Sequence, residues 1–142
     1  MKYVIVYWSR YGNGKKVVER LDGILKQKGA ETQVLTTDEA NPAAMHEADM
    51  YIFSAAQEAF NLQKNMRKFM KMLTGVEGRK FGIINTHAMK NRNQLSKMEK
   101  LLTKKKMAKV AAVDFRIGAG SQTGNGLMAG WEAKLEEFAG KL

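Results

Sequence analysis

Apolar and polar residues alternate between two kinds of segment along the chain. Short, almost continuous apolar runs are typical of strands buried on both faces of a parallel sheet. They occupy residues 3–8, 32–36, 50–55, 80–86 and 109–116. Between and after these runs, apolar side chains recur every three or four positions, which predicts helices. The predicted helices cover residues 17–25, 41–48, 62–73, 95–102 and 127–138.

Strands that alternate with helices predict an α/β domain, in which helices cover both faces of a parallel sheet. Gly29 ends the first helix, and Pro42 stands in the first turn of the second. No linker or low-complexity segment interrupts the 142 residues, so we expect one domain over residues 1–142.

The pattern Ser-x-x-Gly-Asn-Gly occurs twice, at residues 9–14 and 121–126. The first copy follows the first strand, at the carboxyl edge of the sheet, where ligands of open α/β sheets bind. Free amides and the dipole at a helix start attract anions, and glycines let the backbone approach them closely. A phosphate monoester therefore fits this turn. The alternative is a helix start that binds nothing.

The composition limits the chemistry that the chain can perform. It has no Cys and only two His, which excludes disulfides and thiolate catalysis and makes a metal site unconvincing. No apolar run approaches the roughly 20 residues that span a bilayer, and we expect a cytoplasmic protein. Net charge is +10, and residues 61–109 hold 14 Lys and Arg against two Glu. This basic region is either a solvated face or a docking surface for an acidic partner.

The segment IVYWSRYGNGKKV resembles the phosphate loop of flavodoxins, which typically reads S/T-x-T-G-N-T after the first strand. Ser9, Gly12 and Asn13 match this pattern. Tyr11 and Gly14 stand where threonines are usual, so two hydroxyl ligands are missing. Two rival motifs fail: the dinucleotide fingerprint lacks its third glycine, and the G-x-x-x-x-G-K-[ST] loop of nucleotide triphosphatases is absent.

The resemblance extends along the chain. DMYIFSAAQEAFNLQKNMRKFMKML is similar to the third strand, flavin loop and helix of flavodoxins, with matches at Asp49, Ser54 and Phe69. KFGIINTHAMKNRN stands where the fourth strand leads into a second flavin loop. The resemblance implies a three-layer α/β/α sandwich with five parallel strands in the order 2-1-3-4-5.

The resemblance also implies FMN as the cofactor of an electron-transfer protein. Its binding residues are then Ser9, Arg10, Tyr11, Gly12, Asn13, Gly14, Ala55, Ala56, Gln57, Glu58, Phe60, Thr86, His87, Ala88 and Met89. Flat cover for the flavin ring would come from Tyr11, Phe60, His87 or Met89, because neither flavin loop contains a Trp. We assign no catalytic residue and no metal ligand.

The positive charges predict how such a protein would behave. Lys90, Arg92 and the following lysine-rich helix would favour a negatively charged reduced flavin, which makes it less reducing than in an acidic flavodoxin. The expected partner is an acidic redox protein or reductase that docks on residues 61–109. The lysine-rich helix lacks interleaved aromatic residues, which makes nucleic acid an unlikely partner.

Two other functions stay open. The chain also resembles flavodoxin-like protoporphyrinogen oxidases, so an FMN oxidoreductase acting on a quinone or porphyrinogen is one. The long insertion that those enzymes carry after the fifth strand has no room between Phe115 and Leu127. The other is a flavin-free module that binds polyanions.

The second glycine-rich turn follows the last strand. At about 4.8 Å per strand, that strand lies roughly 14 Å from the first, so one phosphate cannot contact both turns. The second turn could reach the second flavin loop or bind another anion. We favour a cap in which Thr123 or Asn125 starts the last helix.

Overall fold

The computed structural model describes residues 1–89 and 93–142. Five parallel strands form the sheet in the order β2-β1-β3-β5-β6, which is the order expected from the sequence. They are β1 (Lys2–Tyr7), β2 (Glu31–Thr36), β3 (Met50–Glu58), β5 (Lys80–His87) and β6 (Ala108–Arg116). A two-residue strand that the pattern did not predict, β4 (Asn61–Leu62), pairs antiparallel with the end of β3.

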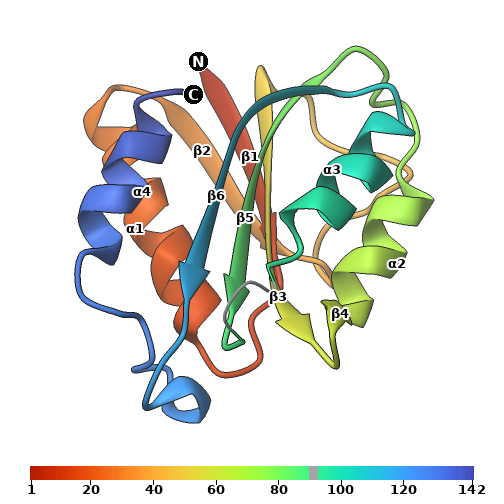
Figure 1. Cartoon of the computed structure of the whole chain (residues 1–142). Coiled ribbons are helices and arrows are strands. Elements are labelled where there is room, and N and C mark those ends of the chain that lie inside the picture. Colours follow the sequence, from red (N-terminus) through yellow and green to blue (C-terminus); the bar gives the residue numbers. More distant parts are fainter. Residues whose placement is uncertain (90–92) are drawn as a thin grey trace.

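Helices cover both faces of the sheet, so the predicted three-layer architecture is confirmed (Figure 1). One face carries α1 (Asn13–Gln27) and α4 (Trp131–Ala139), and the other carries α2 (Lys64–Met72) and α3 (Leu95–Thr103). A short 3₁₀ helix, η1 (Ser121–Thr123), lies between β6 and α4. No helix in the described part of the chain is long and apolar enough to cross a membrane.

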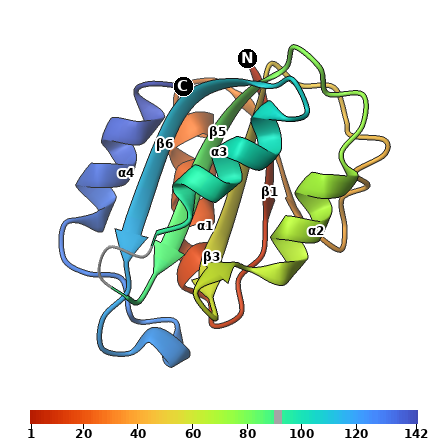
Figure 2. The same cartoon turned by 45° about the vertical axis from the view of Figure 1, so that its right-hand side comes forward.

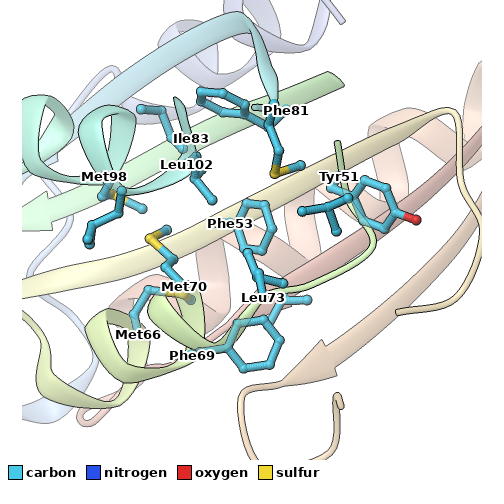
Figure 3. Packing of buried hydrophobic residues seen from close by; sticks show 14 of the residues in the cluster. Tyr51, Phe53, Met66, Phe69, Met70, Leu73, Phe81, Ile83, Met98 and Leu102 are labelled. Carbon is cyan, nitrogen blue, oxygen red and sulfur yellow. The ribbon is translucent and has the colours of Figure 1, made fainter. Parts of the chain in front are cut away.

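The central strands are buried on both faces, which explains their continuous apolar sequence. In β1, Val4 and Val6 point to the α2/α3 side, whereas Tyr3 and Ile5 point to the α1/α4 side. Figure 3 shows how the α2/α3 side is filled: Met66 and Met70 of α2 and Met98 of α3 pack over the strands. Phe53 and Phe69 lie with ring centroids 6.4 Å apart. This packing fixes α2 and α3 on the sheet, and the N-termini of both helices point to its carboxyl edge.

The helix predicted at residues 41–48 is wrong, because residues 37–49 run from β2 to β3 as turns and irregular chain. The Asn41 side chain accepts a hydrogen bond from the Ala43 amide at 3.0 Å, and the Asn41 carbonyl accepts one from Ala44 at 3.1 Å. An Asn that bonds to the backbone two residues on closes a local turn, which competes with helix propagation.

The last helix begins at Trp131 rather than at Leu127. Gly130, just before it, has φ of 88°, a left-handed conformation that breaks the helical path. Leu127 instead bridges to Ile117 in an antiparallel pair. The connection between β6 and α4 is therefore longer than the sequence pattern indicated, and it is free to reach back across the carboxyl edge.

Candidate functional site

A cavity of about 250 Å³ opens at the carboxyl edge of the sheet, and four connections that are distant in sequence form its walls. They follow β1, β3, β5 and β6. The lining residues are Trp8, Ser9, Arg10, Tyr11, Asn13, Gly14, Ala56, Gln57, Glu58, Thr86, His87, Ala88, Ile117, Ser121 and Gln122. Figures 1 and 2 both place η1 next to the β1–α1 connection at this edge.

The first glycine-rich turn leads directly into α1. Gly12 is the residue before the helix and has φ of 99°, which a residue with a side chain rarely adopts. The Ser9 hydroxyl accepts a hydrogen bond from the Gly12 amide at 3.1 Å. No side chain caps α1, so the amides of its first turn, which have no partner within the helix, remain available to an anion.

The two glycine-rich turns contact each other, and Asn13 joins them. Its side-chain amide donates to the Ser121 carbonyl at 2.7 Å and accepts from the Gly126 amide at 2.9 Å. Lys16 Nζ also donates to Asn125 Oδ1 at 2.8 Å. The first and last strands are three strands apart, as expected. The inference that the two turns are therefore separated is wrong, because the connection after β6 folds back toward β1.

The proposed capping role of the second turn is also wrong. Thr123 Oγ1 donates to the Gly120 carbonyl inside the turn, Asn125 accepts from Lys16, and no side chain caps α4. Gly124, at φ of 77°, lies so close to the first turn that an added Cβ would come within 2.7 Å of the Tyr11 carbonyl oxygen. The repeated glycines thus serve different purposes: the first set exposes amides, and the second allows close packing.

An ion pair connects the first turn to the loop after β3. Arg10 donates to both carboxylate oxygens of Glu58, at 2.9 and 3.1 Å, and Gln63 donates to the same carboxylate at 3.2 Å. Arg10, which we expected beside a phosphate, is therefore held by a carboxylate on the cavity wall. It reaches a phosphate only if the ligand competes with Glu58.

Four of the expected binding residues do not line the cavity. Gly12 precedes α1 but is not among the lining residues. Ala55 is buried in the sheet, where its carbonyl accepts a hydrogen bond from Asn85 at 2.9 Å. Phe60 is 68% exposed and Met89 is 42% exposed, so neither covers a ligand in this arrangement. As flavin contacts, all fifteen residues stay predictions.

Sequence reasoning missed four lining residues: Trp8, Ile117, Ser121 and Gln122. Trp8 was counted as the end of a strand, although β1 ends at Tyr7 and Trp8 lines the cavity. The expectation that no Trp is available for flat cover therefore overlooked a candidate. The other three belong to the connection after β6. The repeated glycine pattern was the only sign in the sequence that this connection could contribute to the site.

His87 ends β5 at the cavity wall and is 5% exposed. Its Nε2 lies 2.6 Å from Asp114 Oδ2 on β6, and its Nδ1 lies 2.8 Å from the Met89 carbonyl oxygen. Lys134 of α4 lies 3.6 Å from the other Asp114 oxygen. Burial raises the pKa of Asp114, but the His87 hydrogen bond and the Lys134 charge outweigh it, so this pKa lies below its ordinary value.

Within residues 1–89 and 93–142, no three His, Asp or Glu side chains are grouped to hold a metal ion. The sequence argument for a less reducing flavin used Lys90 and Arg92, which lie outside the described residues.

No protein-family model matches the sequence, and no curated protein matches it. Solved structures do match. An archaeal flavodoxin has a TM-score of 0.73 at 16% identity, covering 99% of this chain and 98% of its own. Two-electron reduced flavodoxin of Megasphaera elsdenii has a TM-score of 0.79 at 14% identity, covering 96% and 95%. At these identities the matches show the fold, and the chain has the flavodoxin-like fold.

A redox enzyme also contains this fold. Rubredoxin oxygen:oxidoreductase from Desulfovibrio gigas matches with a TM-score of 0.81 at 13% identity, over 99% of this chain and 34% of that protein.

The contact between the turns predicts the effect of two matched substitutions. Gly124→Ala and Gly130→Ala both place a side chain at a left-handed φ, but only the first meets a nearby atom, since nothing lies within 4 Å of a Cβ at Gly130. We expect Gly124→Ala to lower the free energy of unfolding by about 1–3 kcal/mol more than Gly130→Ala. Urea denaturation of both variants measures this. Equal losses would show that the turns do not touch.

Proposed function

We propose that this protein binds FMN and transfers electrons. The proposal rests on one observation. The start of α1, which no side chain caps, and the loops that follow β3 and β5 line the same cavity. The flavodoxin-like fold supports it, because the family uses this edge of the sheet for FMN.

The described residues fit an FMN molecule. The phosphate would lie at residues 9–14, where Gly12 and Gly14 leave the amides accessible. The flat ring would lie between the loops at residues 56–58 and 86–88. Trp8 and Tyr11 lie on the cavity wall that the first glycine-rich turn forms, and they would supply aromatic surface there. Ser121 and Gln122 add polar groups from the second turn.

Bound FMN would supply the redox chemistry, and the chain's residues would bind and orient it. The walls contributed by Ile117 and Ala88 would keep water from part of the ligand. Glu58 would have to share Arg10 with the phosphate or release it. These roles need no nucleophile or proton-transfer residue from the protein.

The partner that we propose is an acidic redox protein that docks beside the cavity. Four exposed lysines in the described part of the basic region lie at two opposite edges of the sheet. Lys64 and Lys68, both exposed, lie on the first turns of α2, next to Gln63, which bonds to Glu58 on the cavity wall. Lys80 and Lys106 lie at the opposite edge of the sheet, where β5 begins. There the Lys106 carbonyl accepts a hydrogen bond from the Gly78 amide. Of these four lysines, Lys64 and Lys68 lie beside the cavity and would guide a partner to it.

The visible spectrum of the purified protein, before and after incubation with FMN and desalting, tests the proposal. Retained flavin absorption is the expected result. A protein that stays colourless and does not retain added FMN would overturn it, and salt-sensitive binding to a nucleic acid would then favour the polyanion-binding function. Retained FMN together with rapid turnover of a quinone would instead favour the oxidoreductase.

Gly14 offers a sharper test of the phosphate turn, because threonine is usual at this position in flavodoxins. A Cβ at Gly14 would make only ordinary contacts, 3.5 Å from Ser9. We expect Gly14→Thr to bind FMN about tenfold more tightly than Gly14→Val, since the hydroxyl adds a hydrogen bond to a charged group. Fluorescence titrations measure both. Riboflavin, which lacks the phosphate, should not distinguish the two variants, and equal FMN affinities would contradict the phosphate placement.

The division of the basic region predicts different effects of charge reversal. Ferricyanide serves as an anionic electron acceptor of defined structure. We expect Lys64→Glu/Lys68→Glu to slow its reduction by the FMN-loaded protein several-fold at low ionic strength, whereas Lys80→Glu/Lys106→Glu leaves the rate nearly unchanged. Stopped-flow kinetics measure the rates, and the difference should vanish at about 1 M salt, where screening extends to about 3 Å. If both double variants slowed the reaction equally, the lysines beside the cavity would have no special role in guiding the acceptor to it.

A further inference from the structure

A second cavity, of about 410 Å³, lies between α2 and the connection from β2 to β3. We call it the α2 groove. Thr37, Asp38 and Pro42 line it from the connection, and five residues of α2 form the opposite wall. Among the described residues, the α2 groove and the cavity at the carboxyl edge have no lining residue in common. The α2 groove is therefore separate from the candidate FMN site.

The wall that the connection forms is fixed at both ends. The Thr37 amide donates a hydrogen bond to the Tyr7 carbonyl at 3.0 Å, which ties the connection to the sheet. The Thr74 amide, just after α2, donates to the Pro42 carbonyl at 3.0 Å, which ties the connection to the chain that leaves the helix. Backbone hydrogen bonds thus define the groove as a feature of the fold.

The α2 residues in the groove lie on one side of the helix, at spacings of four or five positions. They are Lys64, Asn65, Lys68, Phe69 and Met72. At 1.5 Å per residue, this stripe is about 12 Å long. Four residues of extended chain span about 13 Å. The α2 groove therefore has the length of a short peptide segment.

The groove changes from charged to apolar along the helix. Lys64 and Lys68 are exposed, and neither forms an ion pair with an acidic residue in the described part of the chain. Helix α2 contains no acidic residue and no side chain caps its start, so its first amides add positive potential there. Toward the other end, Phe69 is buried and Met72 is 52% exposed. A ligand that covered the Met72 side chain would bury apolar surface favourably.

We propose that the α2 groove binds a short acidic segment of a protein partner. Carboxylates of the segment pair with Lys64 and Lys68, and an apolar side chain packs against Phe69 and Met72. Charge complementarity favours this occupant over a second copy of the chain, because two copies would each carry a net charge of +10.

The position of the groove suits a partner that must reach the cavity at the carboxyl edge. Helix α2 begins directly after Gln63, whose side chain donates to Glu58 on the wall of that cavity at 3.2 Å. A segment bound in the α2 groove would hold its protein beside the cavity without filling it. That the partner is a redox protein rests on the proposed function, whereas the binding of an acidic segment does not.

Asp38 shows the sign of the charge that the groove accepts. Among the described lining residues it is the one acidic side chain, and it is exposed. Together with Lys64 and Lys68 it leaves one net positive charge in the groove. Its carboxylate repels a ligand carboxylate, so Asp38→Asn should strengthen the binding of an acidic segment by about threefold. A neutral segment would gain nothing from this change.

Amide NMR of the ¹⁵N-labelled protein, titrated with the peptide acetyl-Glu-Glu-Ala-Leu-amide, tests the proposal. We expect saturable shifts in α2 and in residues 37–42, with a dissociation constant on the order of 1 mM. The peptides acetyl-Gln-Gln-Ala-Leu-amide and acetyl-Glu-Glu-Ala-Ala-amide should each bind at least about threefold more weakly. Equal binding of the leucine and alanine peptides, matched by inorganic phosphate, would reduce the groove to a general anion attractor and overturn the proposal. Tighter binding of a four-nucleotide DNA strand would also overturn it.

Lys68→Gln and Lys71→Gln form a matched pair of variants. Both remove one positive charge from an exposed position of α2, but Lys71 does not line the groove. We expect Lys68→Gln to weaken binding of the acidic peptide about threefold and Lys71→Gln to leave it nearly unchanged. Equal weakening by both variants would show attraction by the whole basic surface and would overturn binding in the groove.

Repeating the titration with FMN present separates this proposal from the proposed function. Because the two cavities have no described lining residue in common, the peptide should bind equally with and without FMN. Displacement of FMN by the peptide would place the peptide in the other cavity and overturn the inference. Retained FMN without peptide binding would overturn the groove and leave the proposed function intact. Peptide binding by a protein that does not retain FMN would support the groove and overturn the proposed function.

Discussion

The site depends on one buried amide, the side chain of Asn13. Its two hydrogen bonds fasten the segment after β6 to the turn after β1, although these segments are separated by more than a hundred residues. Asn13 is only 6% exposed, so removal of its amide would leave a backbone N–H and a backbone carbonyl without partners in a nearly dry location. Each such loss costs about 1–3 kcal/mol. The amide therefore stabilises the wall of the cavity.

Three adjacent strands and one edge strand each contribute a connection to the cavity, and Asn13 joins two of these connections, those after β1 and β6. The turn after β1 is fixed by Asn13, and the loop after β3 by the pairing of β4 and by Glu58. At the end of β5, the His87 ring lies 2.8 Å from the Met89 carbonyl oxygen and 2.6 Å from Asp114. The apolar layers that hold the strands, with α1 and α4 on one side and α2 and α3 on the other, bring these connections to one edge.

The alternation of strands and helices could be predicted from the sequence, because short continuous apolar runs alternate with segments of helical periodicity. The strand order followed from the resemblance to flavodoxins and not from this pattern. Residues 41–48 misled the same reasoning, since a Pro after an Asn is compatible with both a helix start and a closed turn. The distance between the turns was misjudged because strand spacing says nothing about how far a long connection folds back. The pairing of His87 with Asp114 could have been found, because polar residues near the carboxyl ends of adjacent strands lie side by side.

The contact between residues 13 and 126 also constrains the order of folding. A chain under synthesis can form β1, α1, β2 and β3 from local and sequential contacts, yet the amide of Asn13 has no partner until the segment after β6 has emerged. Contacts of such long sequence separation form late, because a large loop must close first. The cavity is thus completed only after residues 121–126 have been made.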